Sequence, residues 1–175
     1  IKIEAPYGRG PREYPSDPLG GWIGGAPGPE PWNINALFVK LHRNRKSLCL
    51  DLKKAQARKI FLELVALADV VVENFSARAM PSMGLGYAAL RRANEKIIYV
   101  SMPGYGMSGP YRDRVAFGPT VEPLSGLTQM LGYSPEEPRN SAMALMDPIA
   151  ATQAAAAVTD ALMQRAETGE GCLIE

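Results

Sequence analysis

The chain contains 175 residues, of which 46% are hydrophobic, so its size fits one globular domain or a large part of one. Lys and Arg number 19 against 18 Asp and Glu, and this balance excludes a global basic field that would hold nucleic acid or an anionic membrane. No apolar run approaches the roughly 18 residues of a transmembrane helix, and residues 1–4 lack the features of a signal peptide. We therefore expect a cytoplasmic protein with neither a membrane nor a nucleic-acid partner.

Both ends of the sequence look like pieces of β-strands. Residues 1–4 resemble the tail of one strand, and residues 171–175 the beginning of another. Because both strand edges would stay unpaired, we expect a single incomplete domain, residues 1–175, within a longer polypeptide. Cys49 and Cys172 lie in apolar strand-like runs without metal-ligand spacing, which predicts two buried free thiols and no metal site.

Residues 5–35 are rich in proline and glycine and show no sustained helical or alternating pattern. This segment is predicted to be a long surface loop that is either functional or mobile. The run from Leu41 to Ser47 contains a cationic cluster directly ahead of the next strand. The simpler interpretation of the cluster is a solvated turn, and the alternative is an anion site.

Residues 47–106 alternate between strand and helix patterns. The predicted elements are, in order, a strand at 47–52, a helix at 53–67, a strand at 68–75, a helix at 87–93 and a strand at 96–102. This βαβαβ core predicts an α/β fold with a Rossmann-like parallel sheet and flanking helices. Ligands of such sheets lie beyond the carboxyl ends of the strands, here at Asn74, Phe75 and Ser76 and at residues 103–106.

The stretch from Gly104 to Gly109 fits the dinucleotide-binding pattern G-x-G-x-x-G directly after a strand. The motif also needs a helix that opens at its glycines and an acidic residue that closes a following strand. Here a polar loop follows the glycines, and Glu122 lies in a helical stretch. Binding of NAD is therefore a disfavoured alternative.

The region 119–175 is dominated by Asp147, which stands with Pro148 ahead of an alanine-rich helical pattern that runs to Arg165. An Asp–Pro pair is a strong helix start, because the carboxylate accepts backbone N–H groups and proline suits the first helical position. The helix dipole then favours the ionised carboxylate. Local sequence alone favours a simple N-cap over a catalytic aspartate, since cap aspartates are far more common.

Motifs along nearly the whole chain resemble those of the family III CoA-transferases, or CaiB/BaiF family, which includes formyl-CoA transferase and carnitine CoA-transferases. The matching segments are 1–4 (IKIE), 44–53 (NRKSLCLDLK), 68–75 (ADVVVENF), 84–87 (GLGY), 98–101 (IYVS) and 104–110 (GYGMSGP). The family places its catalytic aspartate ahead of a small-residue helix that ends in A-L-x-x-R-x-x-T-G-x-G. Asp147 precedes such an ending at residues 161–171. The resemblance implies that Asp147 is the nucleophile and that the chain is part of the family's large domain.

The resemblance also implies a reaction. An ionised aspartate attacks the acyl-CoA thioester to give a mixed anhydride and CoA thiolate, and the thiolate returns to form an aspartyl-CoA thioester. A small carboxylic acid then reverses the steps, with backbone amides at the helix N-terminus stabilising the oxyanion. By the same similarity CoA contacts Leu50, Asn74, Phe75 and Ser76. No metal or redox cofactor is required, and the intact protein is expected to form an interlocked homodimer.

The sequence departs from the family's pattern at several positions. The family commonly has Pro-Gly where Ala77 and Arg78 stand, and a CoA-contacting arginine where Ser82 stands. We expect Arg78 or Arg45 to take over the phosphate contact. The pair Phe117-Gly118 replaces the Tyr-Glu of some transferases and the His-Asp of the racemase branch, which disfavours a racemase. The family's glycine-rich loop, which covers the aspartate, should lie beyond residue 175.

The leading hypothesis is a segment of a CoA-transferase that acts on an acyl-CoA and a small carboxylic acid. Two alternatives stay open. One is a CoA-binding or dimer-building segment without turnover, which the missing auxiliary residues would suit. The other is an NAD-dependent oxidoreductase that uses the turn from Gly104 to Gly109.

Overall fold

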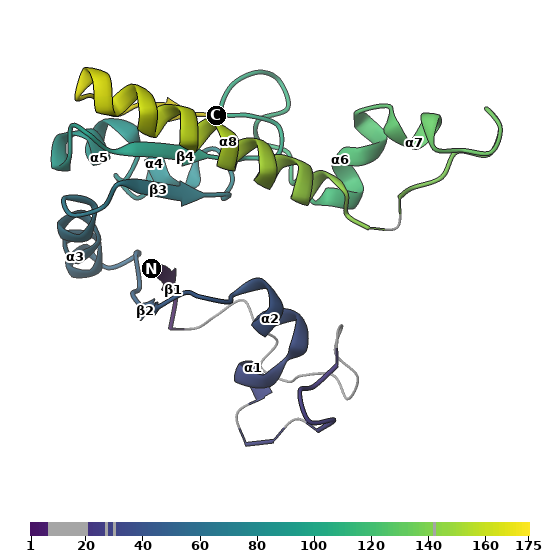
Figure 1. Cartoon of the computed structure of the whole chain (residues 1–175), viewed down its shortest axis with the longest axis horizontal. Coiled ribbons are helices and arrows are strands. Elements are labelled where there is room, and N and C mark those ends of the chain that lie inside the picture. The colour runs from purple at the N-terminus through teal and green to yellow at the C-terminus, as the bar shows by residue number, and fades with distance from the viewer. Residues whose placement is uncertain (7–20, 27, 30, 142) are drawn as a thin grey trace. The chain divides into compact units, whose positions relative to one another are not determined.

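The computed structural model describes residues 1–6, 21–26, 28–29, 31–141 and 143–175 (Figure 1). They fall into an N-terminal unit, Ile1–Ala57, and a C-terminal unit, Arg58–Glu175. Much of the predicted 5–35 loop lies outside the described residues. Among the described residues, no helix is both long and apolar enough to cross a membrane.

The N-terminal unit contains a small parallel sheet and two short helices. Its elements are β1 (Lys2–Glu4), α1 (Pro31–Ile34), α2 (Ala36–Leu41) and β2 (Ser47–Cys49). In the sheet, Ile3 pairs with Leu48. Helix α2 begins after Asn35 because the Asn35 side chain accepts the Phe38 N–H at 2.8 Å, the usual way in which asparagine caps a helix. Because α1 begins inside the 5–35 segment, the prediction that this segment lacks helix is wrong at its end.

The C-terminal unit is built around a three-stranded parallel sheet in the order β3-β4-β5. Its elements are α3 (Ala55–Val65, which begins in the N-terminal unit), β3 (Val70–Glu73), α4 (Ala79–Ser82), α5 (Tyr87–Ala93), β4 (Ile98–Ser101), α6 (Gly118–Leu124), α7 (Leu127–Met130), α8 (Met146–Thr168) and β5 (Leu173–Ile174). Val70 of β3 pairs with Ile98 of β4, and Tyr99 of β4 pairs with Leu173 of β5.

Strand β4 is the core of this unit, because all four of its residues are buried. Ile98 and Val100 pack against Ala161 of α8 on one face of the sheet. On the other face, the Tyr99 ring stacks near Tyr87 of α5 with 6.2 Å between the ring centroids. A central parallel strand that is covered by helices on both faces needs such a continuous apolar run.

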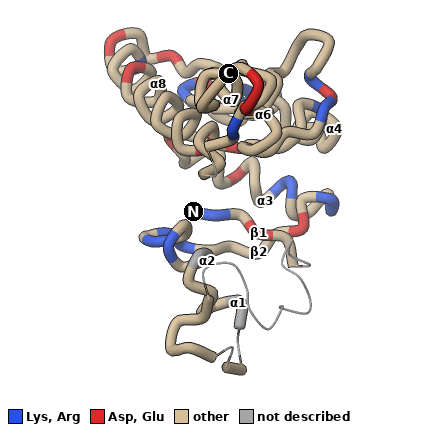
Figure 2. Tube along the Cα trace, turned by 90° about the vertical axis from the view of Figure 1, so that its right-hand side faces the viewer, with Lys and Arg blue, Asp and Glu red and all other residues tan. Residues whose placement is uncertain are grey.

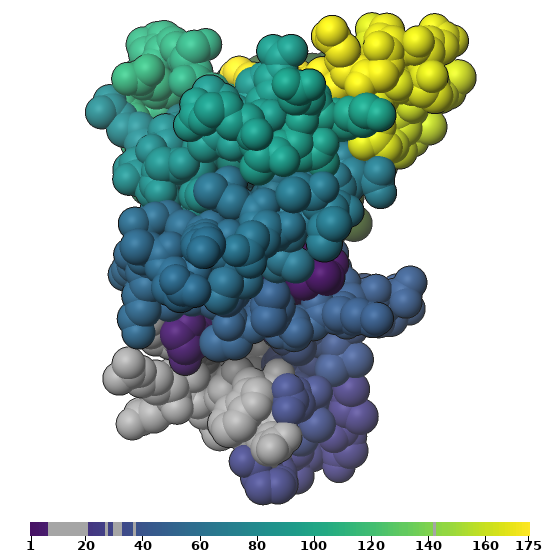
Figure 3. All heavy atoms as spheres, turned by 90° about the vertical axis from the view of Figure 1, so that its left-hand side faces the viewer, coloured from purple at the N-terminus to yellow at the C-terminus, as the bar shows by residue number. Residues whose placement is uncertain are grey.

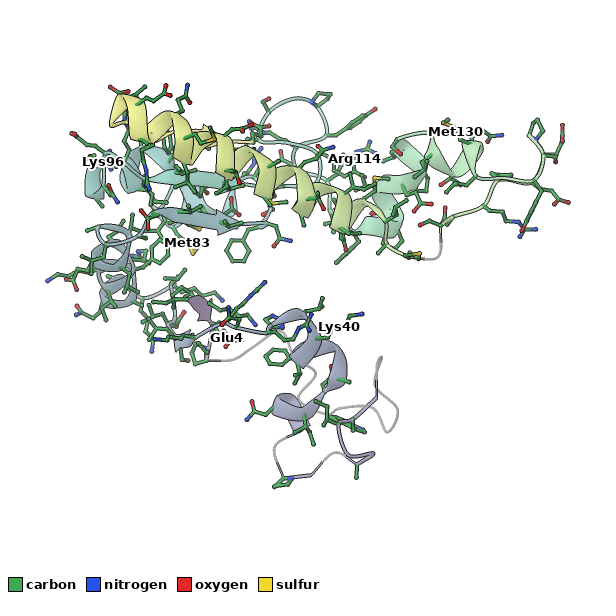
Figure 4. All side chains as sticks on the ribbon, in the orientation of Figure 1. Glu4, Lys40, Met83, Lys96, Arg114 and Met130 are labelled. Carbon is green, nitrogen blue, oxygen red and sulfur yellow. The ribbon has the colours of Figure 1, made fainter. Side chains whose placement is uncertain are left out.

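Arg165, near the C-terminal end of α8, forms hydrogen bonds with the edge of the sheet where β3 and β4 begin. Its guanidinium donates to the Asp69 carbonyl at 3.2 Å, to the Lys96 carbonyl at 3.1 Å and to the Asp69 carboxylate at 2.8 Å. Figure 4 labels Lys96 at this edge, and Figure 3 shows the end of α8, in yellow, at the surface.

The N-terminal half of α8 therefore extends beyond the opposite, carboxyl edge of the sheet. A helix of 23 residues is about 35 Å long, whereas a strand of four residues spans only about 13 Å. Figure 1 shows this half of α8 reaching past β4 toward α6. The predicted nucleophile is thus carried to the side of the sheet where ligands of parallel α/β folds bind.

The predicted α/β class, with parallel strands and flanking helices, is confirmed. The pairing differs from the prediction, because β2 pairs with β1 while β3, β4 and β5 form a second sheet. The alternation of patterns determines the type of each element, whereas strand neighbours depend on long-range contacts. Whether residues 1–175 form one domain stays a prediction. Both cysteines are free thiols, but Cys49 is exposed and Cys172 only half-buried, so their predicted burial is wrong.

The two glycines that follow α8 have different roles, which gives a test of the packing. Gly169 ends the helix with a positive φ of 75°. A Cβ on Gly171 would lie 2.1 Å from the Ile97 carbonyl oxygen and 2.6 Å from the Ile97 nitrogen. Because this obstacle is backbone, we expect Gly171→Ala to lower the free energy of unfolding of the full-length protein by about 1–3 kcal/mol in urea titrations. The exposed neighbour Glu170→Ala is the control, and equal stability of the two variants would contradict the packing.

Candidate functional site

Asp147 lies in the first turn of α8, but it does not cap the helix. The helix begins at Met146, and the N-cap residue, Leu145, makes no side-chain cap bond. The predicted N-cap role of Asp147 is therefore wrong, because the turn starts earlier than the Asp–Pro pair suggests. Its carboxylate is exposed and has no hydrogen-bond or ion-pair partner within the described part of the chain. The carboxylate thus stays available at the positive end of the helix dipole.

The predicted amide donors at this helix start are also not available. The Asp147 N–H donates to the Ala144 carbonyl at 3.0 Å, and Pro148 has no N–H. Neither residue can therefore supply a free backbone donor to an oxyanion beside the carboxylate. Whether other amides of this helix start stabilise an oxyanion stays a prediction.

Gly118, the first residue of α6, lies directly against this carboxylate. A Cβ built on Gly118 would stand 2.9 Å from Asp147 Oδ1 and 2.9 Å from the Ala144 Cβ. Gly118 is buried, whereas the neighbouring Phe117 is 65% exposed. The glycine that the sequence shows only as a departure from the family's Tyr-Glu pair is therefore needed for the close approach of α6 to α8.

A buried carboxylate, Glu122, binds the segment that leads into α8. Glu122 is 1% exposed, and its two oxygens accept the Ser141 N–H and the Ser141 hydroxyl, each at 2.6 Å. Sequence reasoning missed this residue, because an acid within a helical pattern is usually solvent-facing. The available signal was its position among apolar residues, four residues after Gly118 and hence on the same helix face.

The carboxyl end of β3 presents the three predicted CoA contacts from this unit to solvent. Asn74, Phe75 and Ser76 are all exposed, and Phe75 keeps 44% of its surface free. Glu73 shapes this turn, since its carboxylate accepts the Phe75 N–H at 2.7 Å and the Tyr99 hydroxyl at 2.9 Å. Sequence reasoning did not identify this role of Glu73.

The Tyr99 hydroxyl remains a neutral donor in this arrangement. Its burial, and then the negative charge of Glu73, raise the pKa of Tyr99 well above the ordinary value. Glu73 also accepts a hydrogen bond from the Ser101 hydroxyl. The turn that carries Asn74 and Phe75 is thereby tied to the central strand β4.

Arg78 lies at a small cavity next to this turn. The cavity has a volume of about 390 Å³ and is lined by Ala77, Arg78, Pro81, Ser82, Met107 and Arg112. It therefore brings Arg78 together with Ser82, the position at which the family often has its CoA-contacting arginine. Arg112 is a second cation in the same lining, which sequence reasoning missed.

Arg78 is held in place by Asp113. Its guanidinium makes two parallel hydrogen bonds of 2.6 Å to the Asp113 carboxylate, and Arg112 lies 3.7 Å from the same group. The hydrogen bonds from Arg78 lower the pKa of Asp113 below its ordinary value. Figure 2 shows basic and acidic residues side by side in the loop near α4, and Figure 4 labels Arg114 in that loop.

Leu50 and Arg45 belong to the N-terminal unit. The Leu50 N–H donates to the Glu4 carbonyl at 2.9 Å directly after β2, and Arg45 is exposed. Their closeness to the other predicted CoA contacts stays a prediction.

The turn from Gly104 to Gly109 lacks the helix that a dinucleotide site needs. The next helix, α6, begins only at Gly118, and the Met107 N–H already donates to the Glu175 carboxylate at 2.7 Å. Across the described residues, no group of three His, Cys, Asp or Glu side chains could hold a metal ion.

A model of the CoA-transferase family III matches residues 1–175, the whole chain. The chain belongs to this family. It is 37% identical over 145 residues to an acyl-CoA transferase of Fusarium pseudograminearum, covering 80% of this chain and 32% of the relative. It is 33% identical over 135 residues to the succinyl-CoA–D-citramalate CoA-transferase of Chloroflexus aurantiacus, and the match covers 77% of this chain and 34% of that relative. An acetyl-CoA:oxalate CoA-transferase of Acetobacter aceti is 32% identical over 177 residues, covering 100% and 42%.

Solved structures agree with the family III assignment. A CaiB/BaiF family protein from Brucella suis matches with a TM-score of 0.81 and 29% identity, covering 98% of this chain and 43% of that one. The protein Rv3272 of Mycobacterium tuberculosis matches with a TM-score of 0.81 and 28% identity, covering 98% and 45%. The resemblance stated from the sequence is confirmed. The chain spans about a third of the length of the first curated relatives that it matches.

The contact between Gly118 and Asp147 can be tested by adding one methyl group. In Gly118→Ala the methyl would displace the Asp147 carboxylate, so we expect turnover of the full-length family III protein to fall by about tenfold or more. Steady-state kinetics and thermal unfolding would be measured together.

Gly126→Ala is the matched control, because it adds strain at a φ of 84° in the same region with nothing within 4 Å of the new methyl. If Gly118→Ala kept full turnover, the carboxylate would not need the position seen here.

Proposed function

We propose that the full-length protein moves CoA from an acyl-CoA to a small carboxylic acid, with Asp147 carrying CoA as an aspartyl-CoA thioester between two half-reactions. The observation that carries the proposal is the place of Asp147 in the first turn of α8, exposed and without a partner among the described residues, in a chain of this family. Relatives named as CoA-transferases for citramalate and oxalate support the reaction class.

The first half-reaction transfers CoA to the protein. An Asp147 carboxylate oxygen attacks the thioester carbon, the C–S bond breaks, and a mixed anhydride and CoA thiolate result. The thiolate then attacks the Asp147 carboxyl carbon and breaks the anhydride C–O bond, which releases the donor acid as its carboxylate. Covalent catalysis of this kind replaces one difficult step with two easier ones.

The second half-reaction repeats these steps with the acceptor. The acceptor carboxylate attacks the aspartyl-CoA carbonyl and releases thiolate, which then attacks the acyl carbon of the new anhydride. Asp147 returns as a carboxylate. The cycle balances without an oxidant, a net proton transfer or a cofactor other than the CoA substrates.

The residues of the described chain have separate tasks in this cycle. The first turn of α8 holds the Asp147 carboxylate at the positive end of the helix dipole. Asn74, Phe75 and Ser76 form an exposed contact for CoA at the carboxyl end of β3. Since the Asp147 N–H already donates to Ala144 and Pro148 has no N–H, the oxyanion donors must be other amides, at this helix start or elsewhere in the full-length protein. The glycine-rich loop that the family resemblance implies is the candidate.

We place the full-length protein in the cytoplasm as an interlocked homodimer, on the basis of its sequence composition and family resemblance. Size-exclusion chromatography with light scattering would report the dimer. The reaction does not require a membrane or a nucleic acid as partner.

Removal of the Asp147 carboxylate is the direct test of this role. We expect Asp147→Ala to lower kcat by on the order of a thousandfold or more, the scale on which loss of a covalent nucleophile acts. Acyl exchange between a donor acyl-CoA and a labelled acid would be followed in the full-length protein.

Asp160→Ala is the matched control, because Asp160 is another exposed aspartate on α8. Undiminished acyl exchange in Asp147→Ala would refute the role of Asp147 as the nucleophile. If the unmodified protein bound CoA but catalysed no acyl exchange, the alternative of a CoA-binding or dimer-building segment without catalytic activity would be favoured.

We expect Arg78, in the lining of the small cavity, to bind the CoA phosphates. We expect Arg78→Ala to raise the KM for acyl-CoA by about tenfold, the effect of losing one charged hydrogen bond. Asp113→Asn should lower that KM, because the Asp113 carboxylate now occupies the Arg78 guanidinium. Arg114→Ala is the control, since its guanidinium lies over the Tyr111 ring.

An acyl-pantetheine substrate, which lacks the nucleotide phosphates, separates phosphate binding from a general loss of structure. The effect of Arg78→Ala should disappear with this substrate. An equal rise in KM for both substrates would exclude a phosphate contact.

A further inference from the structure

Glu122 is a buried acid, and within the described part of the chain both of its carboxylate oxygens bond to a single residue, Ser141. Its side chain is 1% exposed, and each of its two oxygens accepts one hydrogen bond from Ser141, at 2.6 Å from the backbone nitrogen and at 2.6 Å from the hydroxyl. Carboxylates are almost never fully buried unless they are paired in this way. These two hydrogen bonds join α6 to Ser141, which lies 19 positions further along the chain, and so they hold the loop that contains Ser141 against α6.

That loop is the segment that leads into Asp147. Residues four apart on a helix share one face, and α6 uses Gly118 and Glu122 in this way. Gly118 lies against Ala144 and the Asp147 carboxylate, while Glu122 holds Ser141. One short helix face therefore touches the chain at both ends of the segment 141–147.

Further contacts hold the residues that directly precede Ser141. Thr128 of α7 accepts the Arg139 N–H at 3.2 Å through its carbonyl, and its hydroxyl donates to the Asn140 side chain at 2.8 Å. Ala144 has a φ of 46°, a conformation that an alanine rarely adopts and that persists only when neighbouring contacts impose it. The backbone that sets the start of α8 thus depends on the bonds that flank it.

We infer that Glu122 is a positioning residue for the reaction proposed above, and that it acts through Ser141 to fix where the Asp147 carboxylate stands. The inference rests on Asp147 being the nucleophile. Glu122 itself does not touch a substrate. Its task needs one acceptor for the Ser141 N–H and one hydrogen-bonding partner for the Ser141 hydroxyl.

Glutamine can perform the same task without the charge. Its carbonyl oxygen accepts the backbone N–H, and its amide group donates to the hydroxyl oxygen, which also has acceptor capacity. Methionine has a similar length but provides neither bond. Glu122→Gln and Glu122→Met therefore separate the hydrogen bonds of Glu122 from its charge.

The experiment uses both variants, together with Ser141→Ala, in the full-length protein. We expect Glu122→Met to lower kcat by roughly ten- to a hundredfold, the scale on which a displacement of about 1 Å acts, with the KM for acyl-CoA changed less than about twofold. Glu122→Gln should recover most of kcat, and Ser141→Ala should fall between them. Glu136→Met, at an exposed acid in the preceding turn, is the matched control.

Each outcome decides the inference. Unchanged kcat in folded Glu122→Met and in Ser141→Ala would overturn it, and if Glu122→Met does not fold, Ser141→Ala and Glu122→Gln decide. A Glu122→Gln variant that is folded, binds CoA and is as slow as Glu122→Met would also overturn it, because the charge itself would then be required. If Glu122→Met lowered kcat, raised the KM for acyl-CoA by a similar factor and also lowered the unfolding temperature, Glu122 would only support the fold, and the inference would be overturned. The variants also separate this inference from the proposed function. If Asp147→Ala kept its activity, the proposed function would fail. If Asp147→Ala were inactive while Glu122→Met stayed fully active, only the inference about Glu122 would be refuted.

Discussion

The contact between α6 and the chain that enters α8 is the constraint on which the rest of the site depends. Gly118 has no side chain, so the backbone of α6 approaches the Asp147 carboxylate to a distance at which a methyl group would clash. One turn later, Glu122 holds Ser141 with both of its oxygens. A small residue and a buried acid on the same helix face thereby contact the segment that carries the Asp147 carboxylate, the nucleophile that we propose.

The sheet gives this contact a rigid base. Strand β4 is buried along its length and packs against Ala161 of α8. At the far end of the helix, Arg165 bonds to Asp69 and Lys96 at the amino edge of the sheet. Contacts at both ends and along its middle thus set the position of α8, and with it the position of its first turn, relative to β3. The turn after β3, shaped by Glu73, leaves Asn74, Phe75 and Ser76 exposed on the same side of the sheet, where we propose that CoA binds.

Sequence reasoning identified the types of the elements, because these depend on local patterns, whereas the proposal that Asp147 is the nucleophile came from the family resemblance and stays a prediction. The alternation of strands and helices predicted the parallel α/β class, and the Asp–Pro pair marked the start of α8 to within one residue. It failed where long-range contacts decide. Asp147 was predicted to cap the helix, yet the first turn starts at Met146, and nothing local shows that Gly118 and Glu122 meet the chain at residues 141–147. The pairing of Arg78 with Asp113 was hidden for the same reason, since the two residues lie on different elements.

The central claim is that CoA becomes covalently attached to Asp147 during turnover, and trapping that thioester tests it most directly. The full-length protein would be incubated with acyl-CoA, quenched with hydroxylamine and mapped by peptide mass spectrometry, with protein lacking acyl-CoA as the control. The account predicts a hydroxamate that forms at Asp147 only when acyl-CoA is present. Active turnover with no hydroxamate, or with the hydroxamate on another carboxyl group, would contradict it.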